Sequence, residues 1–366
     1  MIIIPLLAGA LAVIVTLCYA SWLDILDRRV PFVTWLPMLV IGLAAAGIAL
    51  LSLNDGTSLF TGYLQMVSVI LYIAYLGNRD DKKPLQAAFV ITVFLIQIYS
   101  LWYFAGINGT SGVLLSVASL LITAYATWLE SRNIDSLFSN AWPLLYFLVG
   151  TVCWFSYSLS GGGILFLYLG MIEMFCFIFY LFGILQLFGG ADAWALIFIT
   201  LIIPLFPFEP LAGYPAVPFF PFTVLVNAVI FNLVAPVGLF IMNLISGNRA
   251  PWPYLFLGYP VDGNTIGTSF GFIMEEFGER EGVLTRRFLT VRETLGSMVR
   301  GHRRIYTKDL RTTPEKFSKE LGWYKKAGKV WISYGVPFIV PITAGLLFGL
   351  FVGDILTICL KLAGGI

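Results

Sequence analysis

The chain has 366 residues, of which 59% are hydrophobic and only 11% are charged. Its mean hydropathy is +0.89. No soluble globular domain has this balance, so the composition indicates a membrane protein with many spans. The net charge of +2 carries little information because the charged residues are distributed very unevenly. The four cysteines are isolated and form no Cys-x-x-Cys pair. We therefore expect no metal site and no cofactor.

The first apolar stretch, residues 3–23, has no Lys or Arg before it, and Arg28 and Arg29 follow it. A cleaved signal peptide has the opposite order, with a basic region first. We therefore expect a retained span whose N-terminus faces the outside.

Apolar stretches long enough to cross a bilayer recur along the chain. A helix needs about 20 apolar residues for this, and the stretch at 192–207 is short and contains Pro204 and Pro207. The sequence predicts an all-α fold, a polytopic membrane helix bundle of about ten transmembrane helices. The expected spans are 3–23, 33–52, 59–77, 85–105, 112–130, 141–159, 163–187, 192–207, 219–245 and 331–353.

The distribution of basic residues supports this topology. With the N-terminus outside, every Lys and Arg except Lys361 falls in a cytoplasmic loop, as the positive-inside rule requires. Asp24 then ends a helix that runs inward, and Asp192 begins a helix that runs outward. We therefore expect both carboxyl groups at the cytoplasmic face of the membrane.

Residues 248–329 contain most of the basic residues and the only histidine. We expect a cytoplasmic or membrane-surface insertion between a catalytic bundle, 1–247, and a final transmembrane segment, 330–366. Its basic surplus suits anionic lipid headgroups. Packing, membrane contact and substrate handling all remain open as roles.

Two amphipathic helices are expected within this insertion. The second begins at Thr313, with Pro314 at the first helical position. Their apolar faces would consist of Leu284, Phe288, Val291, Leu295 and Met298 in the first, and Phe317, Leu321 and Tyr324 in the second.

Asp24 and Asp192 are the main candidate functional residues. An ionisable group in or beside hydrocarbon is costly and suggests function. Two neighbouring carboxyls share one proton, so one can activate a water while the other polarises a peptide carbonyl. From the dipoles of their own helices we expect Asp192 to be the resting base and Asp24 the resting acid. Arg28, four residues after Asp24, would oppose that assignment.

The sequence around the second aspartate reads Gly189-Gly190-Ala191-Asp192. Glycines beside a catalytic acid permit a sharp turn and the close approach of an extended substrate strand. The first aspartate is followed by Asp27, Arg28 and Arg29, then Pro31.

With these motifs, and with the Pro- and Phe-rich stretch 218–227 that ends at Asn227, the chain resembles the archaeal preflagellin and type 4 prepilin peptidases. These are membrane aspartyl proteases of the GxGD class. The resemblance covers residues 5–50 and 180–245 and implies that Asp24 and Asp192 are the catalytic pair. The implied substrates are preflagellin or prepilin precursors, cut at a short basic leader on the cytoplasmic side.

The chain departs from this family in two respects. Ala191 occupies the third motif position, and the two aspartates are much further apart in sequence than usual, which implies four inserted helices. The bacterial zinc-binding methylase region is absent, so we expect no methyltransferase activity.

Two further polar residues in the expected spans are secondary candidates. Glu173 is either a hydrogen-bonded structural residue or a substrate or conformational site. Asn227 is typical of residues that join helices. Alternatives to a leader peptidase are a presenilin-like intramembrane protease and an acid-pair transporter without protease activity. We expect protein precursors and membrane lipids as partners, and no nucleic acid.

Overall fold

The computed structural model describes residues 3–77, 83–107, 109–132, 141–185, 189–280, 283–290, 305–333 and 337–364. The chain divides into two compact units. The first consists of Met1–Ala228 together with Phe338–Ile366, and the second of Val229–Pro337.

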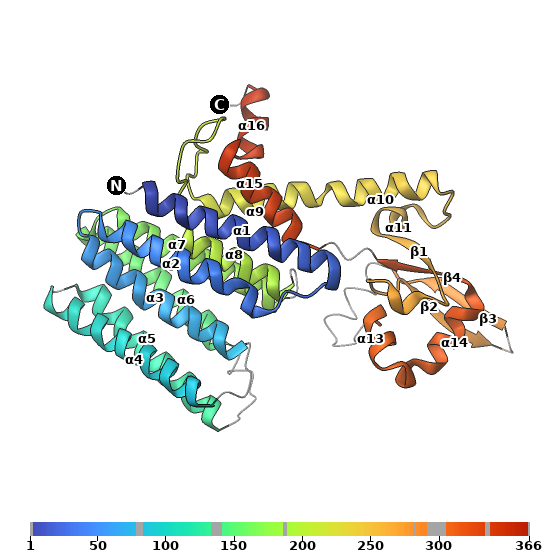
Figure 1. Ribbon diagram of the computed structural model, residues 1–366, viewed down its shortest axis with the longest axis horizontal. Coiled ribbons are helices and arrows are strands. Elements are labelled where there is room, and N and C mark those ends of the chain that lie inside the picture. Colours follow the sequence, from blue (N-terminus) through green and yellow to red (C-terminus); the bar gives the residue numbers. More distant parts are fainter. Residues whose placement is uncertain are drawn as a thin grey trace. The chain divides into compact units, whose positions relative to one another are not determined.

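The regular secondary structure of the first unit is helical, and a loop joins α8 to α9 (Figure 1). A short 3-10 turn, Phe32–Trp35, precedes α2, and the last two helices follow the second unit in sequence. The helices are α1 (Ile3–Asp27), α2 (Leu36–Leu51), α3 (Gly56–Gly77), α4 (Lys83–Gly106), α5 (Thr110–Ser131), α6 (Trp142–Tyr157), α7 (Leu165–Ile184), α8 (Gly190–Ile202), α9 (Phe220–Asn232), α15 (Ile339–Phe351) and α16 (Ile355–Leu362).

The prediction of a polytopic membrane helix bundle is confirmed. Among the described residues, eight helical segments are long and apolar enough to cross a membrane. They become nine if α15 and α16, which are bent by 57°, form one broken span. The expected span at 192–207 is shorter than predicted, because α8 has 13 residues and ends before Pro204. A helix of that length rises about 20 Å, whereas the hydrocarbon core is about 30 Å thick.

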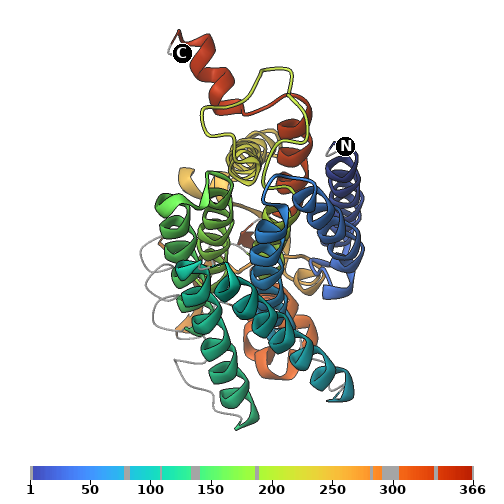
Figure 2. The same ribbon diagram turned by 90° about the vertical axis from the view of Figure 1, so that its left-hand side faces the viewer.

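Helices α1, α8 and α15 are mutual neighbours although they are far apart in sequence. The red helix α15 lies beside the dark-blue helix α1 in both views (Figures 1 and 2). Gly345 allows α15 to approach α9 closely, since a Cβ there would lie 2.8 Å from the backbone O of Val224. Small residues permit such close helix contacts in membranes.

The second unit is mixed rather than all-helical, and it contains two antiparallel strand pairs. The buried carboxyl of Glu275 accepts a hydrogen bond of 2.8 Å from the backbone N–H of Trp331 and so joins β2 to β4. In chain order the main elements are α10 (Val234–Ile245), α11 (Trp252–Leu257), β1 (Gly258–Asp262), β2 (Glu275–Arg280), β3 (Val283–Phe288), α13 (Thr307–Thr312), α14 (Ser318–Ala327) and β4 (Lys329–Ser333).

The prediction of a first amphipathic helix in the insertion is wrong for the residues that the structure describes. Leu284 and Phe288 lie in β3, which pairs with β2 in a hairpin. Residues four apart share one face in a strand as well as in a helix, so their spacing could not separate the two structures. The remaining residues of that pattern, Val291, Leu295 and Met298, lie outside the described part of the chain.

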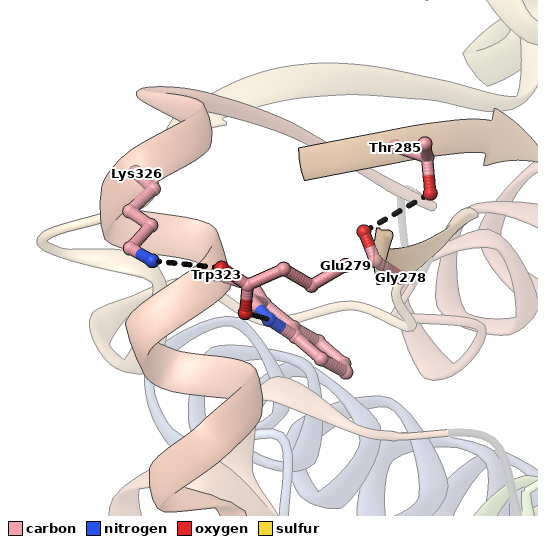
Figure 3. A network of polar contacts seen from close by, with 5 residues as sticks. All are labelled: Gly278, Glu279, Thr285, Trp323 and Lys326. Atoms are coloured by element: carbon pink, nitrogen blue, oxygen red, sulfur yellow. Dashed lines mark hydrogen bonds and ion pairs between the residues drawn. The ribbon is translucent and has the colours of Figure 1, made fainter. Parts of the chain in front are cut away.

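The second expected helix is present. A 3-10 turn, Pro314–Phe317, leads into α14. Tyr324 is buried, and Phe317 and Leu321 pack against the same apolar cluster. A polar contact holds the other side of α14 to β2, because the exposed carboxylate of Glu279 accepts hydrogen bonds from Trp323 and Lys326 (Figure 3).

The second unit extends beyond the expected insertion at both ends. The Asn243 side chain of α10 donates hydrogen bonds of 2.8 Å to the backbone O atoms of Leu255 and Gly258. At the other end, β4 continues to Ser333 and pairs with β1.

Candidate active site

Asp192 lies in the first turn of α8, and its side chain is 9% exposed. Its Oδ2 accepts a hydrogen bond of 2.9 Å from the backbone N–H of Gly189, the residue that precedes the helix. This is one of the two hydrogen bonds of a capping box, the one in which the side chain of the third helical residue accepts from the backbone N–H of the N-cap residue. The positive end of the helix dipole favours a carboxylate at this place.

The two glycines of the motif have different surroundings. A Cβ at Gly189 would lie 2.8 Å from Oδ2 of Asp192, whereas a Cβ at Gly190 would meet nothing within 4 Å. Gly189 therefore leaves room for the Asp192 carboxyl to turn back onto the backbone. Gly190 and the half-buried Ala191 begin the helix without touching that carboxyl.

Asp24 lies in the last turn of α1, which continues to Asp27. The backbone N–H of Arg28 donates to the backbone O of Asp24 over 3.1 Å, and Arg28 has a positive φ of 53°. This left-handed residue ends the helix in the manner of a C-cap. The charge of Arg28 acts favourably on the ionised carboxyl of Asp24.

A third helix, α15, also reaches Asp24. Ile339 is its first residue, and the backbone N–H of Ile339 interacts with the Asp24 carboxyl. One turn earlier on α1, the Ser21 hydroxyl lies 2.7 Å from the Thr343 hydroxyl. Thr343 also donates to the backbone O of Leu17 over 3.3 Å. Two polar contacts thus join α15 to the turn of α1 that precedes Asp24.

Sequence reasoning missed Ser21, Ile339 and Thr343. Ser21 is one helical turn before Asp24 and therefore on the same face, which was an available signal. Thr343 gave no such signal, because it lies more than 300 residues further along the chain. Only the packing of α15 against α1 brings it to the site.

The structure brings Asp24 and Asp192 together. Their helices α1 and α8 pack against each other, and the charge of Asp24 acts directly on the Asp192 carboxyl. Both carboxyls also face the amino end of a helix, α15 for Asp24 and α8 for Asp192. The amino end of α15 offsets the unfavourable carboxyl end of α1 at Asp24, and the assignment of Asp192 as base and Asp24 as acid stays a prediction.

The two secondary candidates lie apart from this pair. Glu173 is fully buried in the middle of α7. Asn227 on α9 donates to the backbone O of Gly353 over 3.0 Å and accepts from the backbone N–H of Ile355 over 3.0 Å. It thus holds the bend between α15 and α16, a structural role of the kind expected for it.

Within the described residues, no group of three or more His, Cys, Asp or Glu side chains is placed to hold a metal ion.

Two carboxyls held at neighbouring helix ends are the groups that acid–base hydrolysis of a peptide bond requires. Comparison with known proteins finds a match to a peptidase family. Residues 250–355 match the family described as "Archaeal Peptidase A24 C-terminus Type II". The matched segment includes most of the second unit and the whole of α15.

The chain is also similar to the preflagellin peptidase of Methanococcus voltae. The two are 28% identical over 200 residues, which cover 51% of this chain and 73% of that protein. Residues 250–355 therefore form an archaeal A24 peptidase C-terminal domain, and the chain is distantly homologous to a preflagellin peptidase.

Proposed function

We propose that the protein is a membrane aspartyl endopeptidase that removes the short basic leader of archaeal preflagellins or type 4 prepilins. The observation that carries this proposal is the packing of α1 against α8, which brings the charge of Asp24 within range of the Asp192 carboxyl although the two residues are remote in sequence. The homology to a preflagellin peptidase supports the choice of substrate.

The two carboxyls share one proton, because two close like charges cannot both form readily. The ionised member removes a proton from a water molecule, which attacks the scissile carbonyl carbon. The protonated member donates a hydrogen bond to the carbonyl oxygen. The pair then protonates the leaving amine and returns to its starting state. Because the groups are coupled, the proton belongs to the pair rather than to one residue.

The surroundings hold the carboxyls in place for this reaction. The backbone N–H of Gly189 orients Asp192, and the amino end of α15 faces Asp24. Backbone donors are fixed by their helices, so the geometry is set before the substrate binds. Arg28 adds a positive charge beside Asp24 and thereby favours the ionised form of the pair.

The active site is proposed to lie at the cytoplasmic face, with the N-terminus outside. The support comes from the basic residues, since all of them except Lys361 fall in loops on one side of the expected topology. Arg28 and Arg29 follow α1 directly, on the side at which Asp24 lies.

The test is cleavage of a preflagellin precursor by the purified full-length protein in lipid nanodiscs. Asp24→Asn and Asp192→Asn should each lower the rate at least about 1,000-fold, since each removes one half of an acid–base pair. Asp27→Asn is the matched control, because Asp27 is exposed at the end of the same helix. It should leave the rate unchanged.

The same assay separates the alternatives. Cleavage inside the precursor's apolar helix rather than after its basic leader would favour a presenilin-like intramembrane protease. Proton-coupled flux without cleavage, abolished by either aspartate variant, would favour a transporter. Full cleavage by either aspartate variant would refute the proposed catalytic pair.

A further inference from the structure

Glu173 is a second membrane-buried acid that the proposed peptidase reaction does not use. Its side chain is fully buried in α7, and neither carboxyl oxygen has a hydrogen-bond partner among the described residues. A buried polar group without partners is costly and rare in native structures. Such a residue within a membrane bundle indicates a functional site.

The neighbouring helix α6 is shaped around this carboxyl. A Cβ at Gly150 would lie 2.8 Å from both the carboxyl carbon and Oε1 of Glu173. The carboxyl therefore fills the space that the missing side chain of Gly150 leaves. One turn away on α6 is the Tyr146 hydroxyl, which lies beside Glu173 and is likewise buried without a hydrogen-bond partner.

A row of buried polar side chains leads from Tyr146 through two further helices. The Tyr146 hydroxyl lies beside Ser119 on α5. The Oγ of Ser119 accepts a hydrogen bond of 3.0 Å from Nε2 of Gln65 on α3. Oε1 of Gln65 accepts a hydrogen bond of 3.0 Å from Ser116. All of these side chains are at most 1% exposed. Polar groups thus continue from Glu173 across α6, α5 and α3.

Among the described residues, no positively charged side chain acts on Glu173. The titratable groups that act on it or feel its charge are Tyr146 and Cys153 on α6 and Cys176 on α7, none of which is cationic. The sequence contains no Lys or Arg in 56–78, 84–131 or 142–184. An isolated carboxylate in a low-dielectric interior loses its charge by binding a proton.

We infer that Glu173 is a proton-binding site that is occupied in the folded protein. The neutral acid donates its O–H to the Tyr146 hydroxyl, and the Tyr146, Ser119 and Gln65 side chains extend the hydrogen-bonded chain into α5 and α3. The ligand is a proton, and the site is independent of the Asp24 and Asp192 pair.

Infrared spectroscopy of the full-length protein in nanodiscs tests this inference. The measurement uses the Asp24→Asn/Asp192→Asn background, so that the aspartate pair does not contribute. At about pH 8, where an ordinary glutamate is ionised, we expect a band of a protonated carboxyl that shifts in heavy water. Glu173→Gln should abolish this band, and Glu209→Gln, which changes an exposed loop residue, should leave it intact.

Tyr146→Phe provides a second readout that does not remove the acid. It should keep the band and move it to higher frequency, because the carboxyl loses a hydrogen-bond partner. A spectrum without the band in the background protein, or a band that survives Glu173→Gln, would overturn the inference. Loss of the band on addition of sodium ions would also overturn it and would identify a cation site. Failure of Glu173→Gln to fold leaves the Tyr146→Phe shift as the deciding result.

Discussion

The aspartate pair and Glu173 place carboxyl groups in the same helical unit in two different ways. Asp24 and Asp192 face the amino ends of α15 and α8, where backbone N–H groups are not used within the helix. Glu173 lies in the middle of α7, where the backbone N–H groups around it are bonded within the helix. A carboxyl at a helix end can therefore keep a negative charge, whereas one in mid-helix must bind a proton.

The two kinds of carboxyl site are built from two different sets of helices. The helices that surround the pair, α1, α8 and α15, supply backbone donors, and a basic residue follows α1. The helices around Glu173, α3, α5, α6 and α7, supply side-chain hydroxyls and amides. The two sets can be altered separately, and each of the following variants tests one side of the comparison.

Among the variants outside the aspartate pair, the largest effect is expected from Gly189→Ala. The new Cβ would lie 2.8 Å from Oδ2 of Asp192 and would displace that carboxyl from its backbone donor. A misplaced catalytic group costs about 100-fold in rate, so kcat for precursor cleavage should fall by about that factor. Gly190→Ala is the matched control, since its Cβ would meet nothing within 4 Å. Equal rates for the two variants would contradict the orienting role of Gly189.

Asn227→Ala tests a buried polar residue that, unlike Glu173, has hydrogen-bond partners for its side chain. It removes the hydrogen bonds to the Gly345, Gly353 and Ile355 backbone. The unfolding free energy should fall by about 2 kcal/mol, because buried backbone groups lose their partner. Unfolding in a mild detergent with increasing denaturant measures the change. Asn232→Ala, near the end of the same helix, should have a smaller effect; a larger loss in that variant would refute the role of Asn227.

Thr343→Val tests the contact of α15 with α1. It removes the hydroxyl that pairs with Ser21 over 2.7 Å but retains the shape of the side chain. The loss of one hydrogen-bonded hydroxyl should cost about 1 kcal/mol of stability, and kcat should fall while KM stays unchanged. Thr343→Ser should restore kcat. A variant that loses stability but keeps its full kcat would show that α15 does not position Asp24.

The smallest effect is expected in the second unit, where an exposed carboxylate has side-chain donors. The hydrogen bonds from Trp323 and Lys326 lower the pKa of Glu279. A lowered pKa in the folded state stabilises the β2–α14 contact at pH values above the ordinary pKa of about 4.3, and this stabilisation is lost as the pH falls through the lowered value. Hydrogen exchange in β2 and α14 should therefore be faster in Glu279→Gln than in the parent protein near neutral pH. The two should become equal in acid; a difference that persists there would contradict this account.

The sequence was sufficient to predict the membrane helix bundle and to suggest that the two aspartates lie near one another, because both inferences depend on simple patterns. The length of each apolar stretch predicts a span. Because successive spans alternate in direction, their order predicts that the end of the first span, near Asp24, and the start of the later span, near Asp192, lie on the same side. The role of α15 could not be predicted, because its contact with Ser21 depends on tertiary packing between helices more than 300 residues apart in sequence. The β2–β3 hairpin was missed because Leu284 and Phe288 fit both a helix and a strand.

The central claim, that Asp24 and Asp192 share one site, can be measured directly by cross-linking. The Asp24→Cys/Asp192→Cys protein, with Cys18, Cys153, Cys176 and Cys359 replaced by Ala, is treated with a short thiol-to-thiol reagent in its membrane. A proteolytic cut between α1 and α8 then separates positions 24 and 192 in the chain, and mass spectrometry of the linked peptides shows whether the bond joins them. We expect a linked peptide pair that contains positions 24 and 192, and no such pair from Asp192→Cys/Glu173→Cys. Absence of the 24–192 link in folded protein with both thiols reactive would contradict the account.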